Sequence, residues 1–179
     1  MVKRYGLRKA RVCRSTPTSL FNAGSFDVIL CHNVLEYVDD PAAMLCSTAR
    51  LIRGSGAILC VLVRNQVGEV LKAALNTGDL LATEDNLAAE WSQESLYGGK
   101  VQLFTVGALE AMLKEASLTI VERGVRLVRD YPPPKISRTA EYERIFSVER
   151  KLGKRGEFAA VACYTHCLAG CAAARSEGD

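Results

Sequence analysis

Two polar residues with useful side-chain chemistry follow a predicted strand. His32 and Asn33 come directly after residues 26–31 (FDVILC), a compact apolar run of β-forming residues that predicts a buried strand. In a doubly wound sheet, ligands bind beyond the carboxyl ends of the strands, near the point where the strand order reverses. An imidazole and a carboxamide in that position can hydrogen-bond a ligand. The alternative is that His32 is a turn histidine that contacts no ligand.

Two other groups of reactive residues have simpler explanations. Glu36 falls in the first turn of a predicted helix, where the helix dipole favours a carboxylate, and this explanation is preferred to a catalytic acid. Cys163, Cys167 and Cys171 are spaced by four residues, with His166 between them. Metal and iron–sulfur sites usually have tighter steps, and an apolar strand with small residues explains the same pattern. The sequence therefore predicts no metal site.

The elements that would position His32 and Asn33 form a βαβ unit. After the first strand, residues 39–41 (DDP) supply a helix cap and a proline at a first helical position. The helix ends at residues 54–56 (GSG), and residues 57–63 (AILCVLV) form a second apolar run. Two such runs separated by a helix predict parallel strands in a sheet covered on both faces. The expected fold class is α/β.

The rest of the chain continues this alternation. Residues 76–100 are long and polar, which predicts either a functional segment or short helices within it. Pattern and capping residues predict the following elements: a helix over 67–75, a helix from Thr105 to about Ala116, a strand over 118–128, a helix over 139–152 and a strand over 158–168.

Composition narrows the class of protein. The chain has 179 residues, 49% of them hydrophobic, with a net charge of +3, which indicates one globular domain. Its seven cysteines lack a CxxC pair and lie mostly in apolar runs, as expected of small buried residues in a reducing compartment. The basic amino terminus lacks a hydrophobic signal region, and residues 57–63 are too few to span a bilayer. We expect a cytoplasmic protein without a membrane segment.

The amino-terminal segment is strongly basic. Residues 1–26 contain six lysines and arginines and no acidic residue before Asp27. Such an arm can meet the phosphates of a nucleic acid. The alternative, a solvated terminus, is favoured because the only interleaved aromatic residue before position 15 is Tyr5.

One segment carries a family resemblance. Residues 25–38 (SFDVILCHNVLEYV), followed by DDP, resemble the fourth-strand signature of class I S-adenosylmethionine-dependent methyltransferases. Residues 51–56 (LIRGSG) stand where that family usually has a proline-glycine-glycine turn, and residues 57–63 resemble its fifth strand. The resemblance implies a Rossmann-like fold whose strands run 4-5-7-6 in a mostly parallel sheet with flanking helices. It also implies S-adenosylmethionine as cofactor, with His32 and Asn33 binding it.

A finer resemblance concerns the methyl acceptor. Residues 61–65, 124–126 and 142–143, with Asp130 and Tyr131, are similar to bacterial tRNA 5-carboxymethoxyuridine methyltransferases, which methylate a carboxylate on a wobble uridine. It implies a tRNA or small-molecule acceptor whose carboxylate lies near Arg126, Arg129 and Tyr131. The alternative is that these arginines simply face solvent. Methyl transfer depends mainly on alignment, so no specific catalytic residue is predicted.

The family's cofactor loop has no counterpart in this sequence. Residues 1–26 contain only Gly6 and Gly24 and no acid, whereas the family has a glycine-rich loop after its first strand and a carboxylate after its second. We therefore expect residues 1–25 to be a basic arm with a remnant of the third strand at residues 10–13. Residues 26–168 would be the carboxy-terminal part of the methyltransferase domain, and residues 169–179 a tail. The hypothesis is a truncated gene product or a misassigned start.

The sequence is compatible with three interpretations. The chain is an enzyme whose full-length form methylates tRNA or a small metabolite, or it is an inactive methyltransferase-derived fragment. Alternatively, it is a binding module. Without the family's first strand, the strand over residues 26–31 would present an open apolar edge for a protein partner or for self-association.

Overall fold

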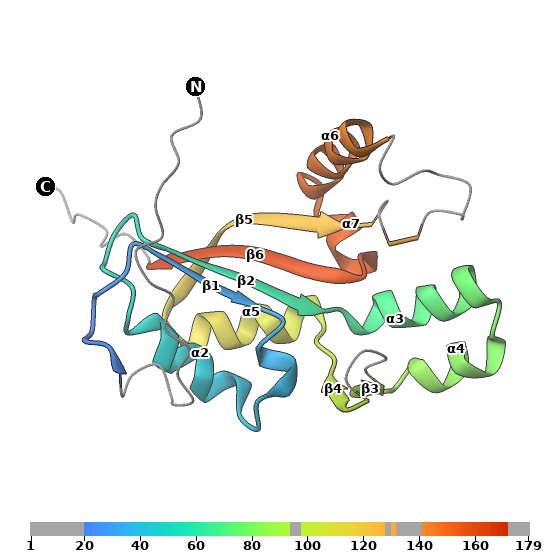
Figure 1. Cartoon of the computed structure of the whole chain (residues 1–179), viewed down its shortest axis with the longest axis horizontal. Coiled ribbons are helices and arrows are strands. Elements are labelled where there is room, and N and C mark those ends of the chain that lie inside the picture. Colours follow the sequence, from blue (N-terminus) through green and yellow to red (C-terminus); the bar gives the residue numbers. More distant parts are fainter. Residues whose placement is uncertain (1–19, 94–97, 128–129, 132–140, 172–179) are drawn as a thin grey trace, which may run out of the picture.

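A computed structural model of the chain describes residues 20–93, 98–127, 130–131 and 141–171 (Figure 1). The predicted third-strand remnant at residues 10–13 and the end of the tail lie outside this part. Strands alternate with helices along most of the chain. In chain order the elements are β1 (Val28–His32), a 3₁₀ turn (Leu35–Tyr37), α2 (Pro41–Ala49), β2 (Ile58–Arg64), α3 (Gln66–Lys72), a π turn (Ala73–Thr77), α4 (Leu80–Asn86), β3 (Trp91–Gln93), β4 (Lys100–Gln102), α5 (Val106–Glu115), β5 (Leu118–Arg126), α6 (Tyr142–Gly153), α7 (Gly156–Val161) and β6 (Tyr164–Cys171).

The main sheet has four strands in the order β1-β2-β6-β5. This confirms the predicted order 4-5-7-6 and the α/β class. β1 pairs parallel with β2, and β6 runs antiparallel to both β2 and β5. Three strands therefore point the same way and β6 points against them. Their carboxyl ends lie at one end of the sheet, together with the beginning of β6.

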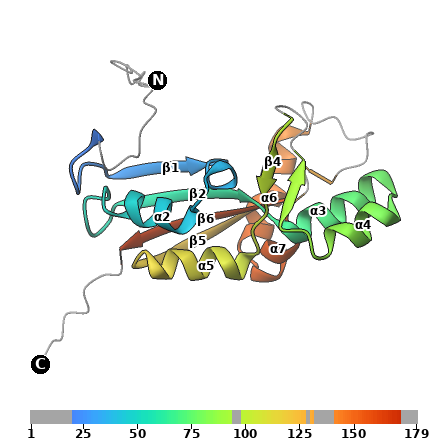
Figure 2. The same ribbon diagram turned by 90° about the horizontal axis from the view of Figure 1, so that it is seen from below.

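One face of the sheet is covered by α2 and α5 (Figures 1 and 2). Both helices begin as the sequence predicts. Asp40 caps α2, which starts at Pro41, and its side chain accepts a hydrogen bond from the N–H of Ala43. The side chain of Thr105 caps α5 by accepting one from the N–H of Ala108. The core between these helices and the sheet consists of fully buried apolar side chains. They include Leu45, Leu59, Val61, Val63, Leu109, Leu113 and Ala169.

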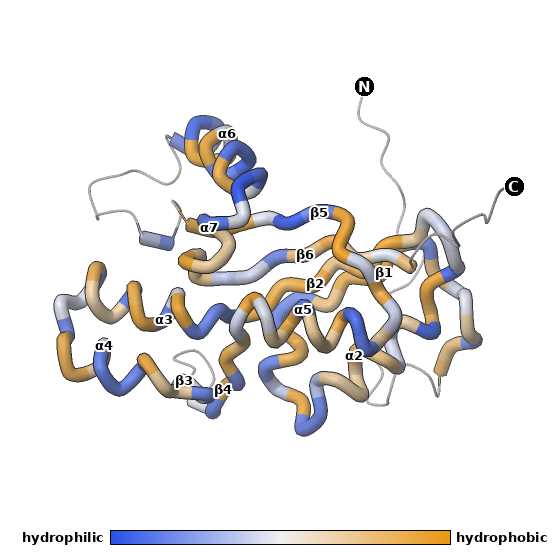
Figure 3. The backbone as a smooth tube through the Cα atoms, turned by 180° about the vertical axis from the view of Figure 1, so that it is seen from behind, coloured by the Kyte–Doolittle hydropathy of each residue, from blue (hydrophilic) through white to orange (hydrophobic). Residues whose placement is uncertain are grey.

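The opposite face is open over β1 and β2 among the described elements. β1 is an edge strand of the described sheet, and Val28 and Leu30 on this face are 61% and 66% exposed. Beside β1 lies an apolar hollow of about 300 Å³, lined by residues that include Phe21, Phe26 and Leu30. The hydropathy of the backbone tube shows how apolar β1 and β2 are (Figure 3). The predicted open apolar edge is therefore present in the described part of the chain.

The predicted last strand, residues 158–168, and the start of the predicted tail at residue 169 both differ from the structure. Residues 158–161 belong to α7, and the last strand occupies Tyr164–Cys171, three residues beyond the predicted end. The prediction was wrong because a short apolar run fits a buried helix and a buried strand equally well. Here Ala159 and Ala162 pack against Val125 of β5, which favours a helical turn at the sheet edge.

The long polar segment contains short elements of its own, as one of the two alternatives predicted. α4 is followed by β3, which pairs antiparallel with β4, and Asp79 caps α4 by accepting the N–H of Ala82. No helix in the described ranges is both long and apolar enough to cross a bilayer.

Close packing of α3 against the chain after α7 gives a test of the fold. A Cβ added at Gly68 would lie 2.5 Å from the carbonyl oxygen of Ala162 and 2.5 Å from the Cα of Cys163. Both are backbone atoms that cannot rotate away. We expect Gly68→Ala to lower the free energy of unfolding by about 2 kcal/mol or more, measured by chemical denaturation.

The matched control is Gly107→Ala in α5, where an added Cβ meets nothing within 4 Å. This substitution should be neutral or raise the free energy of unfolding by about 0.5 kcal/mol, because alanine favours a helix more than glycine does. Equal effects of the two substitutions would show that α3 does not pack against residues 162 and 163 as described.

Candidate functional site

The loop after β1 holds the two residues predicted to bind a cofactor. His32 is the last residue of β1, and Asn33 follows with φ of +51°, a left-handed conformation that asparagine tolerates better than most residues. The N–H of Asn33 donates to the carbonyl of Leu62 at 2.9 Å, so the turn is fixed to β2. The Asn33 side chain is exposed at the carboxyl end of the sheet. The two residues therefore stand where a doubly wound sheet binds its ligands.

Glu36 has a structural contact in the same loop. Its side chain is only 2% exposed, and Oε1 accepts the backbone N–H of Arg64 at 2.9 Å. The carboxylate thus joins the 3₁₀ turn to the end of β2. A backbone contact, more than a helix dipole, explains the acidic residue at this position, and it leaves the role of catalytic acid unsupported.

Asn65 fixes the end of β2 to the beginning of β6. It is fully buried, and Nδ2 donates to the carbonyls of Ala160 and Ala162 at 2.9 and 2.8 Å. Its backbone N–H donates to the carbonyl of Cys163. The position of the site relative to the sheet therefore depends on a buried carboxamide rather than on apolar packing alone.

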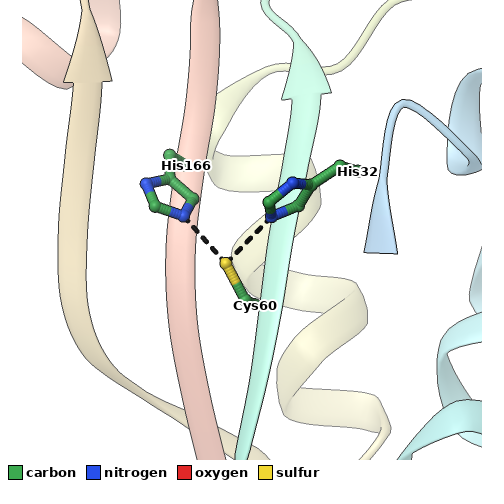
Figure 4. Close-up of side chains that lie close together, drawn as sticks. All are labelled: His32, Cys60 and His166. Atoms are coloured by element: carbon green, nitrogen blue, oxygen red, sulfur yellow. Dashed lines mark hydrogen bonds between the residues drawn. The ribbon is translucent and has the colours of Figure 1, made fainter. Parts of the chain in front are cut away.

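A cluster of His32, Cys60 and His166 lies on the open face, next to this loop. Nε2 of His32 is 3.0 Å from Sγ of Cys60, and Nε2 of His166 is 2.9 Å from the same sulfur (Figure 4). The two imidazole rings meet edge to face, with centroids 5.9 Å apart. Burial raises the pKa of the Cys60 thiol. Burial, and then the charge of His32, lower the pKa of His166.

The cysteines spaced around His166 do not form a site. Cys163 and Cys167 are buried and Cys171 is exposed, and Cys167 and Cys171 are separated by about 13 Å of extended strand. Burial raises the pKa of the Cys163 and Cys167 thiols to about 11, so both are inert thiols at neutral pH. The simpler explanation of their spacing, an apolar strand with small residues, agrees with this placement.

The residues expected to bind the acceptor are at the same end of the sheet but further away. Arg126 ends β5 and pairs with Tyr164, about 14 Å from β1 across three strand spacings. The hydroxyl of Tyr131 donates to the carbonyls of Gly68 and Val161 at 3.1 and 2.9 Å, and burial raises its pKa. Arg129 lies outside the described residues.

Sequence reasoning missed Cys60 and His166 as partners of His32. The alternation of side chains along a strand was a usable signal. It requires residues 60, 62 and 64 to share one face of their strand, and residues 164, 166 and 168 to share one face of theirs. What was missing was the register, which pairs Leu62 with both His32 and His166. That register brings positions 32 and 166 onto one face.

A methyltransferase family model matches residues 7–123, which is more than half of the chain, under the description "Methyltransferase domain". The chain belongs to this methyltransferase domain family. The match covers β1, α2, β2 and α5, and therefore the loop with His32 and Asn33. No curated protein matches the chain.

Several solved structures with a similar fold are methyltransferases by name. A SAM-dependent methyltransferase from Thermotoga maritima has a TM-score of 0.49 and 14% identity, over 83% of this chain and 57% of its own. One from Methanosarcina mazei has 0.48 and 15%, over 86% and 63%. A candidate of the same class from Listeria monocytogenes has 0.50 and 12%, over 84% and 64%. The chain thus spans less than two thirds of the length of each of these structures.

S-adenosylmethionine is the cofactor that membership of this family implies, and the described residues fit one side of it. The exposed Asn33 carboxamide offers a donor and an acceptor beside the carboxyl end of β1. The apolar hollow beside β1 can take a flat, uncharged ring. Neither a glycine-rich loop nor a carboxylate for the ribose hydroxyls occurs in residues 1–26. The described residues therefore fit one side of such a site, the side along β1.

The depressed pKa of His166 predicts a pH dependence of stability. The folded state binds a proton at this imidazole less readily than the unfolded state, in which the pKa of histidine is near 6.5. The stability associated with neutral His166 is thus present above about pH 6.5 and is lost as the pH falls below it. We expect His166→Gln to reduce the fall in unfolding free energy between pH 7 and about pH 5, measured by urea denaturation.

His32→Gln is the matched control for that measurement. Burial is the larger cause of the His166 shift and the charge of His32 the smaller one. The control should therefore keep most of the pH dependence. An unchanged pH dependence in His166→Gln would contradict the burial of a neutral imidazole.

Proposed function

We propose that the chain contributes one side of the active site of a S-adenosylmethionine-dependent methyltransferase. The observation that carries the proposal is the polar loop of His32 and Asn33 at the carboxyl end of β1, in a chain of the methyltransferase domain family. Open α/β sheets bind their ligands at this end. The N–H of Asn33, which donates to the carbonyl of Leu62, and the buried contact of Glu36 hold the loop in place before any ligand arrives.

The chemistry asks little of the protein beyond alignment. The bound cofactor supplies an activated methyl group on a sulfonium. The chain's own residues bind and orient: the exposed Asn33 offers hydrogen bonds to the cofactor at the carboxyl end of β1. This proposal needs no general acid or base, which agrees with the structural contact made by Glu36.

Calorimetric titration of S-adenosylmethionine into the full chain tests the proposal. The informative variant is Asn33→Gly, because glycine keeps the left-handed backbone at φ of +51° and removes only the carboxamide. We expect the wild-type chain to bind and Asn33→Gly to bind about tenfold more weakly, the equivalent of one lost hydrogen bond of about 1.4 kcal/mol.

Ser117→Gly is the matched control, since Ser117 also has a positive φ, of +60°, and lies before β5 at the other end of the sheet. It should leave the affinity unchanged. A folded wild-type chain that does not bind the cofactor would contradict the proposed cofactor contacts at the end of β1.

For the acceptor, we propose a carboxylate, either on a modified tRNA wobble uridine or on a small metabolite. Arg126 supports this because its backbone lies at the carboxyl end of the sheet, on the side away from β1. An arginine can pair with a carboxylate through two hydrogen bonds. The hydroxyl of Tyr131 is already bonded to two carbonyls, so Tyr131 would shape this region rather than donate to the acceptor.

Transfer of a labelled methyl group to bulk tRNA and to small carboxylic acids tests the acceptor. We expect Arg126→Gln to lower the rate about tenfold or more on the true acceptor, with no change in cofactor affinity. Arg150→Gln on the exposed side of α6 is the control and should keep the rate. Label on RNA would support the tRNA acceptor, and label only on small acids would support a metabolite.

The open edge of β1 favours a second function, that of a partner-binding module. Val28 and Leu30 are exposed beside an unpaired strand edge in the described sheet. An exposed edge can take a further strand from another chain or a second copy. Failure of the folded chain to bind the cofactor, combined with a stable complex in sedimentation, would favour this function.

A further inference from the structure

The chain has two histidines, and the fold brings both to one cysteine. His32 ends β1 and His166 lies in β6, 134 residues later in the sequence, yet each Nε2 is within 3.0 Å of Cys60 Sγ. Figure 4 shows the two rings converging on the sulfur from either side. Among the described residues, these are the only three that offer ligand atoms of histidine, cysteine or carboxylate type so close together.

Sheet register explains the convergence. Leu62 pairs with His32 on one side and with His166 on the other, and Cys60 lies two residues earlier on the same face. The cysteine is therefore the diagonal neighbour of both histidines. Diagonal pairs in a sheet are within reach of long side chains, so the three ligand atoms meet without strain in the backbone.

We propose that His32, Cys60 and His166 bind a divalent transition-metal ion of the zinc class, with one coordination position left open. Two imidazole nitrogens and a thiolate are ligands that zinc prefers, and three protein ligands are typical of sites that keep a fourth position for water or substrate. The His32 side chain is exposed, so solvent can reach the cluster from this side. The site does not depend on the proposed methyltransferase function.

The distances allow the ion with small adjustments. In a tetrahedral zinc site, bonds of about 2.1 Å to nitrogen and about 2.3 Å to sulfur separate the two ligand atoms by about 3.6 Å. The observed separations of 3.0 and 2.9 Å must open by about 0.6 and about 0.7 Å. His32 can make this movement because its side chain is exposed.

Gly124 makes room for His166. It pairs with His166 in β5, and a Cβ at this position would lie 2.5 Å from Nδ1 and 3.3 Å from Cγ of the imidazole. A glycine in the middle of a strand otherwise weakens it. The glycine therefore lets the ring lie over the β5 backbone with Nε2 directed at the sulfur.

Coordination would change the protonation of the thiol. It replaces the S–H bond of Cys60 by a metal–sulfur bond and releases that proton to solvent. Each imidazole would coordinate through the lone pair of its Nε2.

Titration of Co²⁺ into the reduced, tag-free full chain tests the site. We expect about one equivalent to bind, with a thiolate-to-cobalt charge-transfer absorption, release of about one proton and displacement by Zn²⁺. Cys60→Ser should abolish the charge-transfer band. His32 is exposed, so His32→Asn should keep the fold. We expect this variant to bind cobalt about a hundredfold more weakly or worse, because loss of a ligand costs at least as much as loss of a residue that only orients a ligand.

Two further variants separate the site from adventitious binding. Cys171→Ser removes an exposed thiol from the other end of β6 and should leave the cobalt spectrum unchanged. Gly124→Ala should displace the His166 ring and weaken binding. Circular dichroism of each variant confirms that it is folded. A folded, reduced wild-type chain that binds neither ion, or a cobalt spectrum that survives in Cys60→Ser and His32→Asn, would overturn the proposal.

Discussion

The buried carboxamide of Asn65 is the contact on which the site end of the sheet depends. It follows β2, the strand that pairs with both β1 and β6, and it donates to two carbonyls of the chain around α7. Phe104 forms a bridge with the same residue, and its N–H donates to the carbonyl of Arg64. Leaving this buried amide without a hydrogen bond would cost about 1–3 kcal/mol. The segments that bond it must therefore pack next to Asn65. The crossovers on either side are thereby fixed at one end of the sheet.

The two faces of the sheet have different roles. The face under α2 and α5 is filled with aliphatic side chains and supplies most of the stability. The other face places His32, Cys60 and His166 among leucines, in two rows across β1, β2 and β6. Apolar packing alone does not account for a thiol between two imidazoles. A polar cluster that costs desolvation energy, as the lowered pKa of His166 indicates, is where a function is to be sought.

Much of the fold followed from the sequence, whereas only part of the candidate site did. The strand within the FDVILC run and the Asp40 cap were predicted because local pattern and turn chemistry determine them, whereas the strand order was implied by the family resemblance. His32 and Asn33 were chosen because they follow a strand. Cys60 and His166 were missed because only the pairing of three strands makes them neighbours of His32, and register is a tertiary property. The start of the last strand was misplaced for another reason, because a short apolar run fits a buried helix and a buried strand equally well.

The alternation of a strand also allows one strand end to serve two ligands. The His32 side chain approaches Cys60 on the open face, whereas Asn33 follows the end of the strand and its side chain is exposed. A metal that fixed the His32 ring would also restrict the backbone of Asn33, whose N–H is bonded to Leu62. If each ligand favours the same arrangement of this turn, binding of one must strengthen binding of the other by the same factor, because such coupling is reciprocal. The two proposals are therefore independent in their tests but joined through a single peptide unit.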